Sequence, residues 1–158
     1  MAIYMKFGPI DGAVTTKGFE KWIELNSLQL GVGRAVGTAA RGATSREGSE
    51  PSISEVVVTK VLDAASNKLF ADAVGGVFDS TVTIKLTTTT KDSVETFLKY
   101  ELSNVGLSGY SITSGGDKPQ ESLSLNFTKI LITFTDLNSK GTGSPDTVGY
   151  DLETMHKV

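Results

Sequence analysis

The chain has 158 residues, of which 39% are hydrophobic and 21% charged, and its formal net charge is −3 at pH 7. This balance argues against a disordered acidic chain and against phosphate backbones as partners, so we expect no nucleic acid. The sequence has no cysteine and a single histidine, His156. Thiol catalysis, zinc fingers and disulfides are therefore excluded, and we expect no metal and no cofactor.

The length suits one domain, which we expect to span residues 1–158. A lysine at position 6 interrupts the first apolar residues, so no signal peptide is predicted. No apolar run approaches the roughly 20 residues that cross a bilayer as a helix. We therefore expect a soluble protein that is made in the cytoplasm and does not insert into membranes.

The composition favours a mostly-β fold. The sequence has 19 Thr, 14 Val and 8 Ile, and side chains branched at Cβ suit a pleated, half-buried surface. Apolar and polar residues alternate in 3–7, and an apolar-rich run follows at 19–25. These two segments are the first predicted strands, with a turn at 8–12 between them.

Residues 34–52 show no periodic apolar pattern and predict a long extended loop. A loop of about nineteen residues is uncommon in a compact domain and is usually functional or disordered. It carries charges of both signs at Arg34, Arg41, Arg46, Glu47 and Glu50. Two interpretations remain open, namely simple disorder and an arm that becomes ordered on a neighbouring subunit.

One helix is predicted, over about residues 64–75, after a strand at 53–62 that is apolar enough to be covered on both faces. Asp63 or Ser66 could cap its start, and Gly75-Gly76 would end it. Its apolar stripe pairs Leu69 with Ala73 and extends over Phe70, Val74 and Val77, whereas Lys68 and Asp72 are expected to face water.

Further strands are predicted at 81–87 and 94–102, and the segment 123–134 changes its apolar phase midway. Leu123, Leu125 and Phe127 occupy odd positions, and Ile130, Ile132 and Phe134 occupy even ones. A strand that changes its buried face does so at a bulge or where it passes between packed layers. The change at Thr128-Lys129 therefore favours a closed or nearly closed barrel over a flat sheet. A turn-rich link at 138–146 and a strand-like piece at 148–152 complete the chain.

No set of residues converges on catalysis. The acid pairs Glu20/Glu24 and Asp136/Asp146 have no spacing that fixes a cleft, and solvated surface positions explain them. His156 fits no triad order. Trp22 and Tyr100 could stack a ligand, but isolated aromatic residues in strands are usually core or interface groups. We therefore predict that the protein is not an enzyme.

Several short segments stand out along the chain. They include Ile3-Tyr-Met-Lys with the Asp11-Gly12 turn, and Phe19-Glu-Lys-Trp-Ile-Glu-Leu-Asn-Ser before the long loop. An Asp-x-Ala-Ser-x-x-Leu-Phe pattern opens the helix at Asp63. Gly115-Gly116 with Glu121-Ser-Leu-Ser-Leu-Asn-Phe-Thr-Lys-Ile, and Gly149-Tyr150-Asp151-Leu152, follow later. In this order, the segments resemble the Hcp (haemolysin-coregulated protein) family of bacterial type VI secretion systems.

The resemblance implies a single-domain β-barrel of two sheets with one short helix. It also implies six subunits that close into a ring, and rings that stack into the hollow inner tube of the secretion system. By the same likeness, a contractile sheath surrounds the tube, a spike protein caps it, and small effectors travel in its lumen. The tube would be secreted to the extracellular space or a target cell without a signal peptide.

For the arm we hypothesise that residues 34–52 reach the adjacent ring, with Arg41, Arg46, Glu47 and Glu50 pairing across the contact. Two alternatives stay open. One is a monomeric ligand-binding β-barrel with Trp22 or Tyr100 at the mouth of its pocket. The other is a phage-type tail-tube subunit, which would also form rings.

Overall fold

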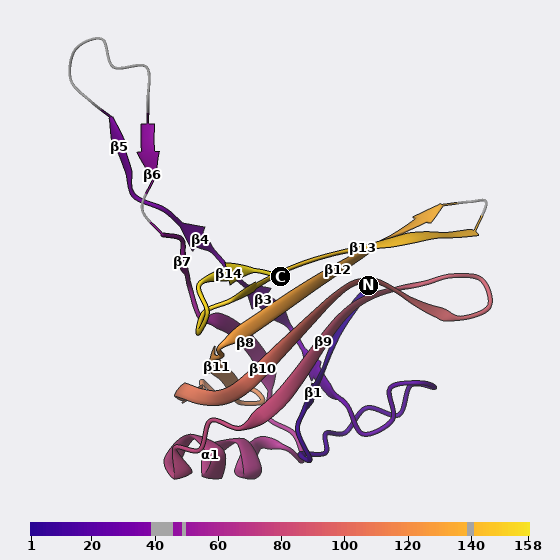
Figure 1. Cartoon of the computed structure of the whole chain (residues 1–158). Coiled ribbons are helices and arrows are strands. Elements are labelled where there is room, and N and C mark those ends of the chain that lie inside the picture. Colours follow the sequence, from indigo (N-terminus) through magenta and orange to yellow (C-terminus); the bar gives the residue numbers. More distant parts are fainter. Residues whose placement is uncertain (39–45, 49, 139–140) are drawn as a thin grey trace.

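The computed structural model describes residues 1–38, 46–48, 50–138 and 141–158, and most of them lie in strands (Figure 1). A large antiparallel sheet runs in the order β2-β1-β9-β10-β12-β13-β14. The bounds of its strands are Ala2–Phe7 for β1, Ile23–Leu25 for β2, Ser80–Thr89 for β9, Val94–Thr113 for β10, Lys129–Asn138 for β12, Gly141–Asp151 for β13 and His156–Lys157 for β14.

A small antiparallel sheet is built on the second half of β10, in the order β10-β11-β8-β3. Its other strands are β11 (Gln120–Asn126), β8 (Val56–Val61) and β3 (Ser27–Gln29). The long strand β10 pairs with β9 and β12 up to Val105 and with β11 from Gly106 onward. At the crossing, Asn104 has φ 52°, a left-handed conformation that Asn tolerates better than most residues.

The chain also passes between the sheets at the predicted phase change. Strand β11 ends at Asn126 in the small sheet, and β12 begins at Lys129 in the large one. Between them, Asn104 donates a hydrogen bond to the Thr128 hydroxyl at 2.9 Å. The interpretation that the segment passes from one layer to another is confirmed.

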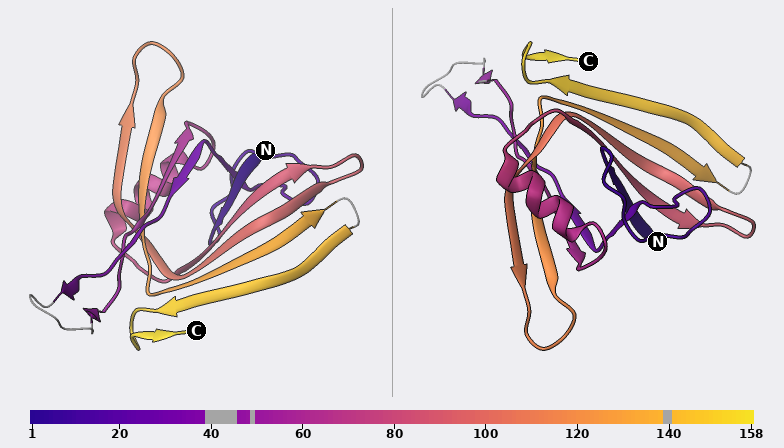
Figure 2. Two further views of the ribbon diagram at one scale, coloured as in Figure 1. Left: turned by 90° about the horizontal axis from the view of Figure 1, so that it is seen from above. Right: turned by 90° about the horizontal axis from the view of Figure 1, so that it is seen from below.

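The two sheets form two layers but do not close into a barrel (Figure 2). Strand β2 pairs with β1, whereas β3, which follows one residue later, pairs with β8. These edge strands are three residues each, so no continuous ladder joins the two edges. The mostly-β prediction with two sheets and one short helix is confirmed for the described residues, and the closed barrel is replaced by this open arrangement.

The hydrophobic core lies between the inner faces of the two sheets. The large sheet contributes Met5, Phe7, Val82, Ile84, Leu102 and Ile130, and the small sheet contributes Val56, Val58, Leu107, Leu123 and Leu125. Helix α1 adds Leu69, and Ala65 just before it is also buried. Because alternate residues of each strand point inward, this core follows the period-2 pattern of the sequence.

Helix α1 spans Ser66–Gly75 and ends at Gly76, which has φ 67° and donates its N–H to the Asp72 carbonyl. Its predicted position is confirmed, but Ala65 holds the N-cap, with no side-chain hydrogen bond. Asp63 instead accepts the Ala65 N–H at 2.9 Å. The helix therefore ends at Gly75-Gly76 as predicted, with a glycine in the left-handed conformation.

The predicted apolar stripe of α1 is buried on one side only. Leu69 is fully buried, but Phe70, Val74 and Val77 are 54%, 72% and 54% exposed. The helix lies across one end of the two sheets (Figure 1), so the core reaches only the side that bears Leu69. Lys68 is exposed as predicted, whereas Asp72 is half-buried and accepts the Leu107 N–H.

The predicted loop 34–52 contains strands. Its described parts hold β5 (Val36–Thr38) paired with β6 (Arg46–Gly48), and β4 (Val32–Gly33) pairs with β7 (Ser52–Ile53). We call the described residues 32–38, 46–48 and 50–53 the arm, which leaves the body of the molecule in Figure 1. Two paired strands that are exposed on both faces need no alternation of apolar and polar residues. The sequence pattern used to predict strands is therefore absent here.

Other strand boundaries also differ from expectation. The predicted strand 19–25 is reduced to Ile23–Leu25, because the chain turns at Phe19 and Lys21, the latter with φ 66°. The predicted strand 53–62 begins at Val56, and its burial alternates along the strand. The piece predicted at 148–152 belongs to the longer β13.

Candidate functional site

The acidic and histidine side chains considered for catalysis lie apart on the surface. Glu20, Glu24, Asp136, Asp146 and His156 are all exposed. Glu20 accepts the Gly18 N–H at 3.0 Å, and its backbone hydrogen bonds lower the pKa of its carboxyl. Within the described part of the chain, no group of three or more His, Asp or Glu side chains is placed to hold a metal ion.

Trp22 and Tyr100 lie on opposite faces of the large sheet, so they do not form one pocket mouth. Tyr100 pairs with Ile84 and Ile132 on the face that carries the core, and burial raises the pKa of its phenol. Trp22 lies on the other face, where it packs edge-on against Phe19 at 5.2 Å. The Lys85 ammonium lies 5.2 Å from the centre of the Trp22 ring, a cation–π contact.

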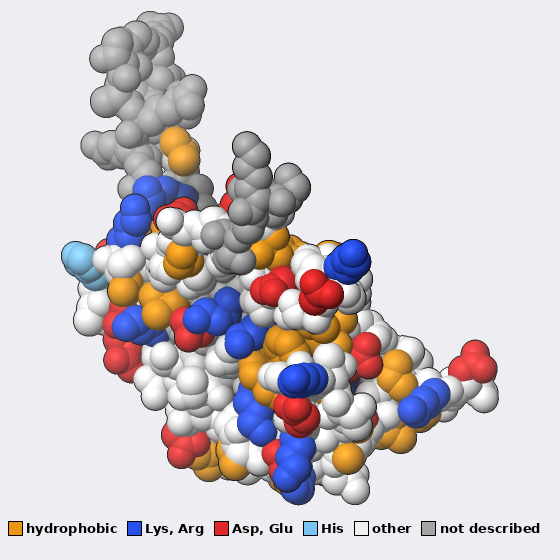
Figure 3. Space-filling model, turned by 90° about the vertical axis from the view of Figure 1, so that its right-hand side faces the viewer, with side chains coloured by type: hydrophobic (Ala, Val, Ile, Leu, Met, Phe, Trp, Pro, Cys, Tyr) orange, Lys and Arg blue, Asp and Glu red, His pale blue; other side chains and the backbone are white. Residues whose placement is uncertain are grey.

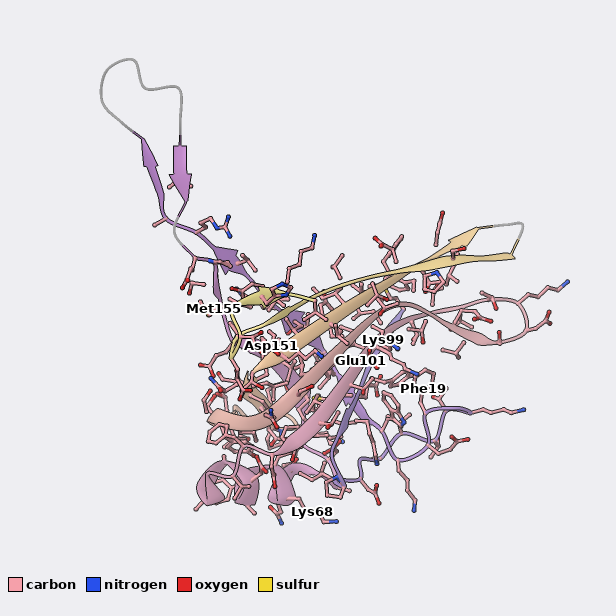
Figure 4. The ribbon with its side chains drawn as sticks, in the orientation of Figure 1. Phe19, Lys68, Lys99, Glu101, Asp151 and Met155 are labelled. Atoms are coloured by element: carbon pink, nitrogen blue, oxygen red, sulfur yellow. The ribbon has the colours of Figure 1, made fainter. Side chains whose placement is uncertain are left out.

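That outer face of the large sheet is polar. Lys99 and Glu101 extend from β10 (Figure 4) and form an ion pair of 3.4 Å. Together with Lys85 and threonines of β10, β12 and β13 they line an open hollow of about 450 Å³. On the face shown in Figure 3, basic and acidic side chains lie interspersed around a hydrophobic area, so that face presents no field of one sign.

The opposite face carries an apolar groove, where the large sheet extends beyond the small one. The groove has a volume of about 250 Å³ between the base of the arm and strands β12 and β13. Its walls are almost wholly apolar, and its lining includes Leu30, Val32, Ile53, Ile132, Val148 and Tyr150. Next to it, Phe134 follows Ile132 on the same face and is 51% exposed.

The apolar groove continues the core face without a cover of its own. The inward residues of β10 and β12 are buried at Leu102 and Ile130 but increasingly exposed toward Phe134. A contiguous apolar surface of this kind is typical of a protein–protein contact rather than of a free surface. The apolar groove is therefore the strongest candidate for a contact with another protein.

A buried polar network, which the sequence analysis missed, fastens α1 to the small sheet. Lys60 of β8 and Glu121 of β11 are fully buried and form an ion pair of 2.6 Å. Lys60 also contacts Asp63 at 2.9 Å, and the Ser66 hydroxyl donates to Glu121 at 2.5 Å. The Tyr110 hydroxyl donates to the other Glu121 oxygen. The sequence did contain a signal for this network, because Lys60 and Glu121 both occupy inward-facing positions in the alternating pattern of their strands.

The network sets the protonation of its members. Burial alone would raise the pKa of Glu121, but the hydrogen bonds from Lys60, Ser66 and Tyr110 outweigh it and hold that pKa below its ordinary value. Burial, reinforced by the bond to Glu121, raises the pKa of the Tyr110 phenol to about 12. Both groups therefore keep one protonation state at neutral pH, and the network holds structure rather than exchanging protons.

The four residues predicted to mediate ring stacking all fall within the predicted loop 34–52. Arg41 lies outside the described residues. Arg46 and Glu47 lie in β6, opposite Thr38 and Gly37, without described side chains. Glu50 follows at the base of the arm and is exposed.

A family model for the type VI secretion system effector Hcp matches residues 4–134. This chain belongs to the Hcp family. The family is one of structural, secreted tube proteins and not of enzymes. No curated protein sequence matches the chain.

Solved structures agree with the Hcp assignment. A type six secretion system protein shares 28% identity, with a TM-score of 0.89 and 99% of each chain covered. Hcp1 from Salmonella typhimurium is 18% identical, with a TM-score of 0.76 over 100% of both chains, and therefore shows the fold alone. A type VI secretion system effector from Yersinia pestis, at 16% identity and TM-score 0.71, covers 94% of this chain and 98% of its own.

The Asp-x-Ala-Ser-x-x-Leu-Phe pattern that suggested Hcp now has a structural explanation. Asp63 and Ser66 belong to the buried polar network, Leu69 enters the core, and Phe70 packs edge-on against Tyr110 at 5.6 Å. Among the described residues, no helix is long and apolar enough to cross a membrane.

Proposed function

We propose that this Hcp chain is a single-domain subunit, residues 1–158, of the inner tube of a type VI secretion system. Six copies close into a ring, and rings stack head to tail into a hollow tube. The observation that carries the proposal is the apolar groove, an uncovered extension of the core face in a chain of the Hcp family. In the ring, each groove is covered by the next subunit.

Such a contact is heterologous, because the covered and the covering surfaces differ, and it closes into a ring when the rotation between neighbours is a simple fraction of a turn. The arm supports the stacking part of the proposal. Its paired strands leave the body of the molecule (Figure 1). Strand β6 carries Arg46 and Glu47, Glu50 follows it, and Arg41 belongs to the same predicted loop. These charges pair with the adjacent ring.

The assembled tube is made in the cytoplasm and then secreted, with the contractile sheath, the spike protein and small effectors as its partners. The support for these partners is membership of the Hcp family. A phage-type tail-tube subunit would use the same architecture, and only its partners would separate the two roles.

The test is the mass of the untagged protein over a concentration series, measured by light scattering and checked by negative-stain microscopy. Six copies of a 16.7 kDa chain give a ring of about 100 kDa, which we expect as the smallest stable species. A species of 16.7 kDa at every concentration would overturn the proposal and favour a monomeric binding module.

A further inference from the structure

A second exposed apolar surface lies at the end of the molecule opposite the arm. Phe70 and Val74 lie one turn apart on the same side of α1, and Val77 and Phe78 follow just after its end. All four are exposed, between 44% and 72%. We call these four residues the α1 patch.

The α1 patch is held in place rather than loosely attached. Phe70 packs edge-on against Tyr110 of β10. The Phe78 ring lies directly over Gly106, so close that a Cβ at Gly106 would meet ring carbons at 2.3 Å and 2.7 Å. Below the helix, the buried polar network fixes its first turn through Ser66. A rigid apolar surface of this kind loses little side-chain entropy when a partner covers it.

An acidic side chain, Asp79, directly follows Phe78 of the α1 patch in sequence. Asp72 and the exposed Asp79 line one hollow together with Lys68, which Figure 4 places at this end of the molecule. Burial raises the pKa of Asp72, and the nearby charge of Asp79 raises it further. Two acids and one lysine leave the hollow with a net negative charge, which favours a basic partner.

Strand β5 and the residues just before it offer one apolar and one basic side chain close together. Val36 of β5 is 54% exposed, and Arg34, two residues before it, is also exposed. In Figure 1 the arm leaves one end of the molecule, and α1 lies at the other. Surfaces at opposite ends of one subunit meet when copies are stacked head to tail.

We propose that the α1 patch of one subunit receives the arm of a subunit in the next ring. Val36 packs against Phe70, Val74 and Val77, and Arg34 lies beside Asp79. This inference rests on the proposed function and adds to it the surface that the arm contacts. Its partner is a second copy of this chain.

The charge part of the contact is tested by exchange. Arg34→Glu and Asp79→Arg, each alone, are expected to raise the protein concentration at which rings stack by about tenfold, whereas the double variant returns close to wild type. Lys91→Glu, an exposed change in the turn between β9 and β10, is the matched control. Stacking is followed by sedimentation velocity and negative-stain microscopy.

The apolar part is tested by cross-linking, because the chain has no cysteine of its own. Both positions of the double variant Val36→Cys with Val74→Cys are exposed, so the fold should be kept. Oxidation is expected to join subunits of successive rings and to give a ladder of masses continuing beyond six chains. Val36→Cys with Val158→Cys, also at an exposed valine, should give no such ladder.

The outcomes separate the two proposals. A wild-type protein that stays monomeric overturns the proposed function and this inference with it. Rings that form but never stack at any concentration overturn this inference together with the stacking part of the proposed function, and leave ring closure standing. The inference alone is overturned if rings of both single charge variants stack at the wild-type protein concentration. It is also overturned if rings of the Val36→Cys, Val74→Cys variant stack but form no cross-linked ladder.

Discussion

At the scale of single residues, the buried pair of Lys60 and Glu121 is the feature that most constrains this protein. Neither side chain reaches solvent, and both are fully hydrogen-bonded. A buried charge that loses its partner is strongly unfavourable, whereas an apolar replacement of both can be nearly neutral. The pair therefore contributes to holding α1 in one position, which the α1 patch needs.

Breaking the pair from one side is expected to destabilise the subunit more than removing it entirely. Lys60→Met should lower the free energy of unfolding by about 3–5 kcal/mol at pH 7, and Lys60→Met with Glu121→Leu by clearly less. Chemical denaturation of the two variants measures the difference. Equal losses in both would show that packing, not charge, holds this site.

The lowered pKa of Glu121 also gives a pH dependence. The unfolded chain binds a proton at Glu121 more readily than the folded one, so the stability from this group is present above the ordinary Glu pKa of 4.5. It is lost as the pH falls through the lower, folded pKa. We expect wild type to lose stability below pH 4.5 more steeply than a Lys60→Met, Glu121→Leu variant, as measured by denaturation at several pH values.

At the scale of elements, turns and short edge strands decide how the two sheets meet. Gly12 lies where the chain between β1 and β2 folds back, and a Cβ there would lie 2.3 Å from the Trp22 carbonyl oxygen and 2.8 Å from the Ile23 Cα. Both are backbone atoms where the chain enters β2, and backbone cannot move aside as a side chain can. Glycine is required here for close approach.

Gly12→Ala is expected to destabilise the protein by about 1–3 kcal/mol, because the added methyl group displaces β2. Gly33→Ala in the arm is the matched control, since a Cβ there meets nothing within 4 Å. Thermal unfolding of both variants checks the prediction. A Gly12→Ala protein as stable as the Gly33→Ala control would show that the turn adapts.

At the scale of the whole molecule, the two faces of the large sheet have different roles. The face with the apolar groove continues the core, and the other face carries lysines, a glutamate and threonines. Neighbouring residues of one strand therefore belong to different surfaces. The ring closure that we propose can therefore be tested by changing one face without touching the core.

Val148→Asp is expected to abolish rings, because it places a charge in the apolar groove at a position that is 45% exposed and so tolerated by the monomer. Thr147→Asp puts the same charge on the polar face of the same strand and should leave rings intact. Light scattering at matched concentrations compares them, and circular dichroism confirms that both stay folded. Rings that persist in Val148→Asp would place the subunit contact elsewhere.

Composition and local pattern were enough for the mostly-β class, for the helix near residues 64–75 and for the passage between layers at Thr128-Lys129. Each depends on neighbours in sequence, either through period-2 alternation or through glycine at a helix end. The order of segments also carried the Hcp resemblance. The arm strands and the open sheet edges at β2 and β3 were not predictable, because backbone pairing between exposed segments leaves no hydrophobic signature.

Only the tertiary structure decided which apolar residues stay uncovered. Phe70, Val74, Val77 and Phe134 follow the same local patterns as buried residues, yet the structure leaves them exposed where one layer extends past the other or where α1 lies across an end of the sheets. Lys60 and Glu121 likewise meet across strands 61 residues apart in sequence. Burial is a property of how the layers overlap in space, and a sequence pattern records only which side of its own strand or helix a residue faces.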